Sequence, residues 1–202
     1  MQPVQSHKTP KSLLLLLAFG LMVSLAGCVQ KLPSPSEDAK TLLVVTTEVV
    51  NKGQRNRMFN YIMKFERKPE SGSWWRGATD PDPNDERFFS KQVALKRNGE
   101  NLFLVYELPP GEYRLFSMTE VPVNVSNAQT KTTRMRVRPF MLEEEKITIY
   151  FSKFYYTQKF TTKGWFTSRK RLIPLKHEDF EKIRTQLKAF KNFELWSFAE
   201  SS

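Results

Sequence analysis

The stretch "NGENLFLVYELPPGEYRLFSM", residues 98–118, decides the fold. Its first half is an aliphatic and aromatic run typical of a strand, and Pro109 ends that run because proline cannot donate to a sheet ladder. Gly111 then allows a backbone conformation that other residues resist. In the strand that follows, Tyr113 and Leu115 alternate with outward-facing residues and so point inward. The stretch predicts two strands joined by a tight Pro-Gly turn.

The pattern Leu-Pro-x-Gly-x-Tyr-x-Leu, residues 108–115, resembles the motif of transthyretin-like and carboxypeptidase-regulatory-like β-sandwiches. The chain departs from that family pattern in the long segment 71–89 and in a helical segment near the C-terminus. The resemblance implies a sandwich fold. It implies no activity, because one fold carries many functions.

Further β-branched or aromatic runs lie on both sides of this stretch, and Pro, Gly or Asn separates most of them. Several short strands at such spacing predict a mainly β protein, an antiparallel sandwich of the transthyretin or immunoglobulin type. The runs cover residues 41–50, 59–68, 90–97, 133–140 and 146–156.

Near the C-terminus the spacing of apolar residues changes from the alternation typical of a strand to the spacing typical of a helix. Phe180, Ile183, Leu187 and Phe190 recur at steps of three, four and three residues, which places them on one helical face. The spacing predicts an amphipathic helix over about 177–191 that covers one face or edge of the sheet. The run 193–198 predicts a final short strand.

The N-terminus has the layout of a secretory signal peptide, residues 1–27. Lys8 and Lys11 precede the apolar run 13–27, which is shorter than the roughly 18–20 residues that span a bilayer. The four residues Leu-Ala-Gly-Cys that end at Cys28, the only cysteine, resemble a bacterial lipobox. The resemblance implies cleavage before Cys28 and acyl chains, such as palmitate, on that residue. The alternative is a buried cysteine in an ordinary helix.

The same resemblance implies a location for the protein. Val29 follows the cysteine where aspartate would retain an enterobacterial lipoprotein at the inner membrane, so the resemblance implies the outer membrane, with the domain facing the periplasm. Residues 28–40 are rich in proline, serine and charge, and they predict a lipidated cysteine followed by a flexible tether. The domain is then expected over residues 41–202.

The composition is that of a folded, strongly basic protein. The chain has 202 residues, 40% of them hydrophobic, which suits one domain after the signal peptide. The formal net charge is +11, and loss of Lys8 and Lys11 with the signal peptide leaves +9. Such a charge favours an anionic partner: anionic lipid, lipopolysaccharide or peptidoglycan. Export argues against nucleic acid.

Two basic clusters and three tryptophans are the candidate contact residues. In the first cluster, the arginines share one face of a strand while Met135 and Val137 take the other. The alternatives are a solvated basic face, and tryptophans that pack under a loop. The candidates for anionic-surface binding are Arg134, Arg136, Arg138, Arg169, Lys170 and Arg171, and those for exposed aromatic contacts are Trp74, Trp75 and Trp165.

Catalytic and metal motifs are weakly represented in the sequence. His177 is the only histidine after the signal peptide, and its place beside two acidic residues at a helix start favours a capping or solvated role. In the acidic loop 80–86, side chains with oxygen atoms occupy alternate positions, as the ligands of a calcium loop do. Prolines stiffen this loop, however, and Asp85 stands where a calcium loop needs glycine, so the sequence favours an acidic surface loop. The sequence predicts no enzyme activity, cofactor or metal.

These patterns favour a membrane-anchored lipoprotein that is a structural or protein-binding component of a cell-envelope assembly, such as a secretion or appendage complex. The alternative is a binding module for peptidoglycan, polysaccharide or anionic lipid. An enzyme is the third class, and a deep pocket lined by carboxylates would be its structural sign.

Overall fold

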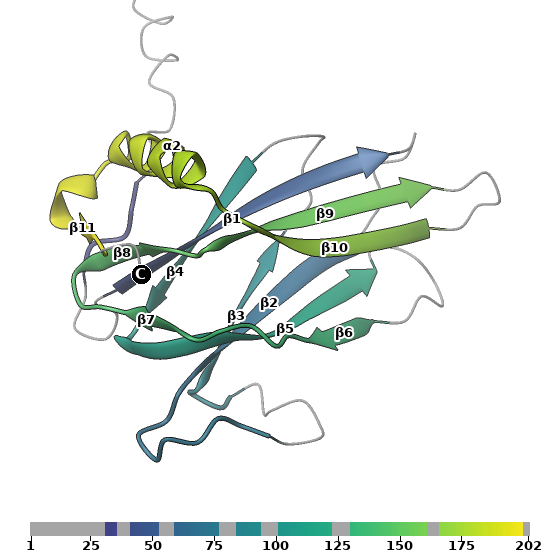
Figure 1. Cartoon of the computed structure of the whole chain (residues 1–202), viewed down its shortest axis with the longest axis horizontal. Coiled ribbons are helices and arrows are strands. Elements are labelled where there is room, and N and C mark those ends of the chain that lie inside the picture. The colour runs from purple at the N-terminus through teal and green to yellow at the C-terminus, as the bar shows by residue number, and fades with distance from the viewer. Residues whose placement is uncertain are drawn as a thin grey trace, which may run out of the picture.

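The computed structural model describes residues 31–35, 41–52, 59–76, 84–93, 101–122, 130–160 and 166–199. These residues form two facing β-sheets with a helix on the outside of one of them (Figure 1). The predicted class, a mainly β sandwich with one C-terminal helix, is confirmed.

The first sheet, called sheet one, is built around the long strand β1 (Thr41–Lys52). On one side β1 pairs with β4 (Asn101–Leu108), and on the other side it pairs first with β8 (Lys146–Ile149) and then with β9 (Ser152–Phe160). Two further strands extend this sheet: β10 (Phe166–Pro174) pairs with β9, and the short β11 (Ser197–Phe198) pairs with β8.

The second sheet, called sheet two, has β5 (Gly111–Pro122) and β2 (Phe59–Arg67) at its centre. Its other strands are β3 (Phe88–Val93) beside β2, and β6 (Lys131–Arg134) and β7 (Phe140–Leu142), which follow one another along the free side of β5. All its pairings are antiparallel.

Sheet one differs from the expected antiparallel arrangement, because it is mixed. Strand β1 runs parallel to β8 and β9, and β8 runs parallel to β11. Parallel neighbours need a long crossover connection. Here the crossover includes the whole of sheet two, which the chain builds between β1 and β8.

The predicted Pro-Gly turn is the point where the chain passes from sheet one to sheet two. Gly111 has φ +146°, and a Cβ atom there would lie 2.9 Å from Nε of Arg67. The Tyr113 hydroxyl donates to the carbonyl oxygen of Pro109 at 2.9 Å, which ties the strand back to the turn. The special backbone expected at Gly111 is therefore confirmed.

The main core fills the space between the sheets and is rich in aromatic residues. Tyr61, Phe65, Tyr113, Phe154 and Tyr156 have no exposed surface. The rings of Tyr61 and Tyr156 stack across the sandwich with centroids 3.9 Å apart. Contact between large rings from both sheets holds the two layers in register.

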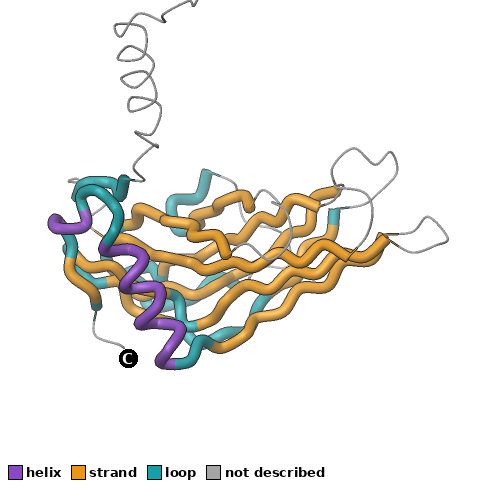
Figure 2. The backbone as a smooth tube through the Cα atoms, turned by 90° about the horizontal axis from the view of Figure 1, so that it is seen from above, coloured by secondary structure: helices purple, strands orange, loops and turns teal. Residues whose placement is uncertain are grey.

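The helix α2 (His177–Lys188) lies over the outer face of sheet one (Figure 2). A second core lies between the helix and that face. Ile183 and Leu187 of α2 pack with Leu42 and Val44 of β1. This explains why β1 begins with an unbroken apolar run, since its residues alternate between two covered faces. The helix ends at Lys188, shorter than the predicted 177–191, and a 3-10 turn, η1 (Phe193–Leu195), precedes β11.

Residues 31–35, here called the N-terminal segment, differ from the expected flexible tether. Leu32 is only 1% exposed and belongs to the second core. Its backbone N–H donates to the carbonyl oxygen of Lys191 at 2.9 Å, and Lys31 forms a parallel bridge with Lys191. The expectation of a free tether is therefore wrong for these five residues, because Leu32 is buried in the second core and hydrogen bonds tie the segment to residues 191–196.

Candidate functional site

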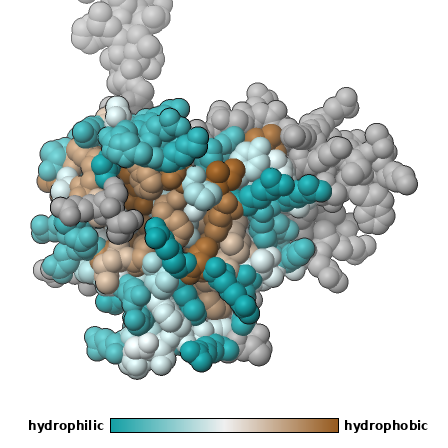
Figure 3. All heavy atoms as spheres, viewed as in Figure 1, coloured by the Kyte–Doolittle hydropathy of each residue, from teal (hydrophilic) through white to brown (hydrophobic). Residues whose placement is uncertain are grey.

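A cleft of about 390 Å³ opens where sheet one, sheet two and α2 meet. In Figure 3, apolar surface lies in the middle of the face below α2, crossed by hydrophilic side chains. The cleft is lined by the linker before β7, by β7 and β8, by α2 and by the end of β11. Its lining residues are Glu112, Arg138, Pro139, Phe140, Met141, Glu143, Ile147, Thr148, Ile149, Tyr150, Phe151, Phe180, Arg184, Phe198 and Ala199.

The cleft exists because β11 covers only part of β8. Pairing between them reaches Phe198 and Ile147, and the last bond of the pair runs from the Ala199 N–H to the Ile147 carbonyl at 3.0 Å. Within the described residues, no strand lies beyond Thr148 and Ile149 on that side. In the described part of the chain, the outer edge of sheet one is therefore open along the second half of β8.

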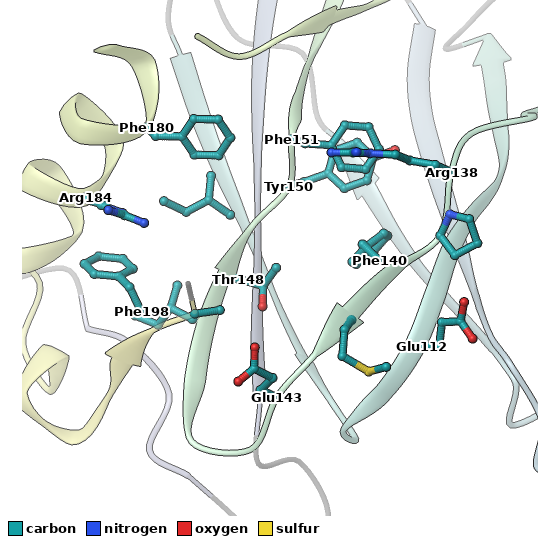
Figure 4. A pocket seen from close by; sticks show the side chains of 15 residues that line it. Glu112, Arg138, Phe140, Glu143, Thr148, Tyr150, Phe151, Phe180, Arg184 and Phe198 are labelled. Atoms are coloured by element: carbon teal, nitrogen blue, oxygen red, sulfur yellow. The ribbon is translucent and has the colours of Figure 1, made fainter. Parts of the chain in front are cut away.

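Aromatic rings and two arginines form the walls of the cleft (Figure 4). The guanidinium of Arg138 lies 5.0 Å from the ring centroid of Phe151, and that of Arg184 lies 5.3 Å from the ring centroid of Phe198. Figure 4 places the two arginines on opposite sides of the opening. Met141 is 55% exposed at the rim. The lining also contains Glu112 and Glu143, which are paired with Lys68 and Lys146, and Arg184 is paired with Glu181 at 3.0 Å. Among the described residues, Arg138 is the charged group of the cleft that forms no ion pair, so an apolar floor beside this cation suits a ligand that joins apolar groups to a negative charge.

Two hydroxyl groups in the β8 region of the cleft lack partners. Oγ1 of Thr148 and the hydroxyl of Tyr150 are buried and have no hydrogen bond to any described residue. Burial raises the pKa of Tyr150 far above its ordinary value, so the phenol stays protonated at neutral pH. Both groups remain able to donate or accept a hydrogen bond.

The tryptophan pair lies on the outer face of sheet two, where a buried carboxylate holds it. Glu66 has no exposed surface; it accepts from the Trp75 N–H at 2.6 Å and forms an ion pair with Arg114, also at 2.6 Å. Arg114 also donates to the Trp75 carbonyl at 2.9 Å and lies 4.7 Å from the Trp74 ring centroid. Both indole rings are half-buried, with Trp75 packed edge-on against Phe116. The structure therefore gives the pair a packing role beside the contact role expected from sequence.

The first basic cluster keeps its predicted alternation of exposed and inward residues, but the single strand predicted over 133–140 is wrong, because residues 135–139 form a linker between β6 and β7. Arg134, Arg136 and Arg138 are exposed, while Met135 and Val137 pack against the main core. The three arginines do not form one site: Arg134 lies over the Trp75 ring at 5.0 Å, whereas Arg138 lines the cleft.

The second basic cluster is divided by strand alternation, which corrects the expectation of one surface. Arg169 and Arg171 are exposed on β10. Lys170 points between the sheets; its side chain is 14% exposed and its Nζ lies 3.5 Å from Glu120. Loss of hydration lowers the pKa of Lys170, and the charge of Glu120 opposes that shift. Lys170 is therefore a partner of Glu120 and not a surface contact.

The remaining predicted residues either lie outside the described residues or take no part in the cleft. Cys28, Trp165 and the first half of the acidic loop lie outside the described residues. In its second half, Asp85 is paired with Arg87 at 2.6 Å, which lowers the pKa of Asp85. His177 is exposed at the start of α2.

The described part of the chain contains no candidate membrane span or metal site. No described helix combines the length and apolar character needed to cross a membrane. No group of three or more His, Cys, Asp or Glu residues in the described ranges is placed to hold a metal ion.

Comparison of the chain with protein-family models, with curated proteins and with solved structures gave no match. The cleft was also missed by sequence reasoning. Arg184 and Phe180 were visible only as parts of a helix, and no local pattern links them to Arg138 or to the short β11. The single available signal was that "FELWSF" is too short to cover β8.

Proposed function

We propose that this protein is a lipid-anchored bacterial envelope protein without catalytic activity, which binds a protein partner in a secretion or appendage assembly. Its anchor is Cys28, and its domain faces the periplasm from the outer membrane. The observation that supports protein binding is the cleft beside the open edge of β8.

An open strand edge beside an apolar cleft is suited to an extended peptide. Such a segment can continue the sheet from the point where β11 stops, so that main-chain hydrogen bonds hold it and the cleft receives its alternate side chains. Arg138 then favours a segment in which an acidic residue accompanies apolar ones. The partner proposed is a protein with such a segment.

The test compares two neighbouring arginines. Arg138→Glu reverses a charge inside the cleft, whereas Arg136→Glu makes the same change two residues away at an exposed position outside the cleft lining. When an ion pair is buried in a complex, removing or reversing the charge on one side costs about 2 kcal/mol or more of binding free energy, roughly thirtyfold in affinity. The tagged mature protein is purified from detergent-solubilised membranes, and co-purifying proteins are quantified by mass spectrometry.

A co-purifying protein should be lost with Arg138→Glu and kept with Arg136→Glu. If both variants retain the same proteins as the wild type, the cleft is not the binding site.

A further inference from the structure

The N-terminal segment is fixed to the domain by contacts with both ends of the turn that follows α2. The indole N–H of Trp196 donates to the Pro33 carbonyl at 2.8 Å. The side-chain amide of Asn192 donates to the Leu32 carbonyl and to Oγ of Ser34, both at 3.2 Å. Asn192 has φ +68°, a left-handed backbone that asparagine tolerates better than most residues. These bonds, with the burial of Leu32, make the segment part of the folded domain.

This docking leaves little chain between the domain and Cys28. Only Val29 and Gln30 separate Cys28 from Lys31. At about 3.3 Å per residue, the cysteine lies within about 10 Å of the docked segment, against about 40 Å for a tether that is free up to residue 40. Given the proposed lipid anchor, the end of the domain that carries the N-terminal segment must therefore lie close to the membrane surface.

Three lysines lie on the surface around the N-terminal segment. Lys31 and Lys191 are partners in the bridge, and Lys188 ends α2, three residues before Lys191. All three are exposed, and none forms an ion pair with an acidic residue in the described ranges. Like charges directly opposite each other are unfavourable without a counter-charge. An anionic surface supplies that counter-charge.

An exposed apolar side chain lies in the 3-10 turn that follows Lys191. Leu195 in η1 is 47% exposed and directly precedes Trp196, which contacts the N-terminal segment. Glu194 lies in the same turn, and Glu145 lies beside the start of β11, where its carbonyl oxygen accepts from the Ser197 N–H at 3.3 Å. We call Lys31, Lys188, Lys191 and Leu195 the anchor-side surface.

We propose that the anchor-side surface lies on the bilayer that holds Cys28 and binds its anionic headgroups. This inference rests on the proposed lipid anchor. The lysines contact headgroup phosphates, each worth several-fold in binding, and Leu195 enters the interfacial layer. The domain is thereby held in one orientation, with β6 toward the opposite end of the sandwich from α2 (Figure 1).

The experiment uses the acylated mature protein in vesicles. Acylation occupies the chain's only cysteine, so an introduced cysteine is the single site for a thiol-reactive fluorophore. Leu195→Cys places the label on the anchor-side surface, and Lys131→Cys places it at the start of β6. The vesicles are phosphatidylcholine alone or a phosphatidylcholine–phosphatidylglycerol mixture, and both carry a lipid with a nitroxide quencher on its headgroup.

In the mixed vesicles, the label at position 195 should lose most of its fluorescence and the label at position 131 almost none. Changing Lys31, Lys188 and Lys191 to Gln together, or raising the salt concentration, should restore much of the lost fluorescence. Lys64→Gln, on sheet two, should restore none. Phosphatidylcholine alone should quench position 195 less than the mixture does.

Equal quenching at the two positions would overturn the orientation, and quenching at position 195 that ignores charge and salt would overturn headgroup binding. The intact mass of the protein separates these outcomes from failure of the anchor. A mass without acyl chains refutes the lipid anchor and this inference together, whereas an acylated protein with unoriented labels refutes this inference alone.

Discussion

At the scale of single residues, Glu66 explains how a surface loop keeps a fixed shape. Its carboxylate has no exposed surface although it lies on the outer face of a sheet, because Arg114 and the backbone of Trp75 enclose it. A buried carboxylate is costly to leave without its partners, and here each oxygen has one. The loop that carries the two tryptophans is therefore pinned by one side chain.

Glu66→Ala should lower the free energy of unfolding by about 3 kcal/mol, since it leaves the Trp75 N–H and Arg114 without their acceptor. Glu112→Ala is the matched control. Glu112 also forms a 2.6 Å ion pair, with Lys68, but both side chains are about one-third exposed, and such pairs contribute about 1 kcal/mol or less. Urea unfolding of both variants measures the difference, and equal losses would argue against the structural role given to Glu66.

At the scale of elements, the N-terminal segment is a short stretch whose docking depends on one leucine. Leu32 touches the second core, which contains α2, β1 and β8 residues. Because it links the start of the domain to its last turns, its burial joins residues that are far apart in sequence.

Leu32→Ala should destabilise the protein by about 3 kcal/mol, the usual cost of emptying a buried leucine site. Leu195→Ala, a change at a leucine that is 47% exposed, should cost much less. Thermal unfolding of the mature protein measures both. An unchanged melting temperature for Leu32→Ala would mean that residues 31–35 behave as the flexible tether expected from their composition.

The strands show what local patterns can predict. Runs with β-branched and aromatic residues, such as those in β1 and β2, were recognised because their apolar residues face a core. Strand β10 was missed because its inward residues are polar: Lys170 meets Glu120, and Oγ of Ser168 lies within hydrogen-bonding distance of the Tyr61 hydroxyl. Where the inward residues of a strand are polar, its sequence lacks the alternation of apolar and polar residues by which a strand is recognised.

The predicted strand 146–156 shows a second feature that local sequence patterns could not predict. Its pattern is continuous, yet the structure divides it into β8 and β9, which pair with successive parts of β1. That division depends on where the chain returns from sheet two, which is a property of the whole fold. Local periodicity carries no information on it.

At the scale of the whole molecule, the cleft combines parts that are distant in sequence. Arg138 comes from the linker before β7, Tyr150 follows β8, and Arg184 comes from α2. Fold class could be predicted because it follows from many local patterns that agree. The candidate site could not, because it depends on how far β11 extends along β8.

The central claim is that a protein held at the membrane by Cys28 binds a partner in the cleft. A photo-reactive amino acid at Met141, the 55% exposed rim residue, tests both parts in growing cells, with the same amino acid at Lys131 as the control position. We expect one discrete protein adduct from position 141, and this adduct should disappear with Arg138→Glu and with Cys28→Ser. Adducts that are the same at both positions, or that persist in both variants, would contradict it.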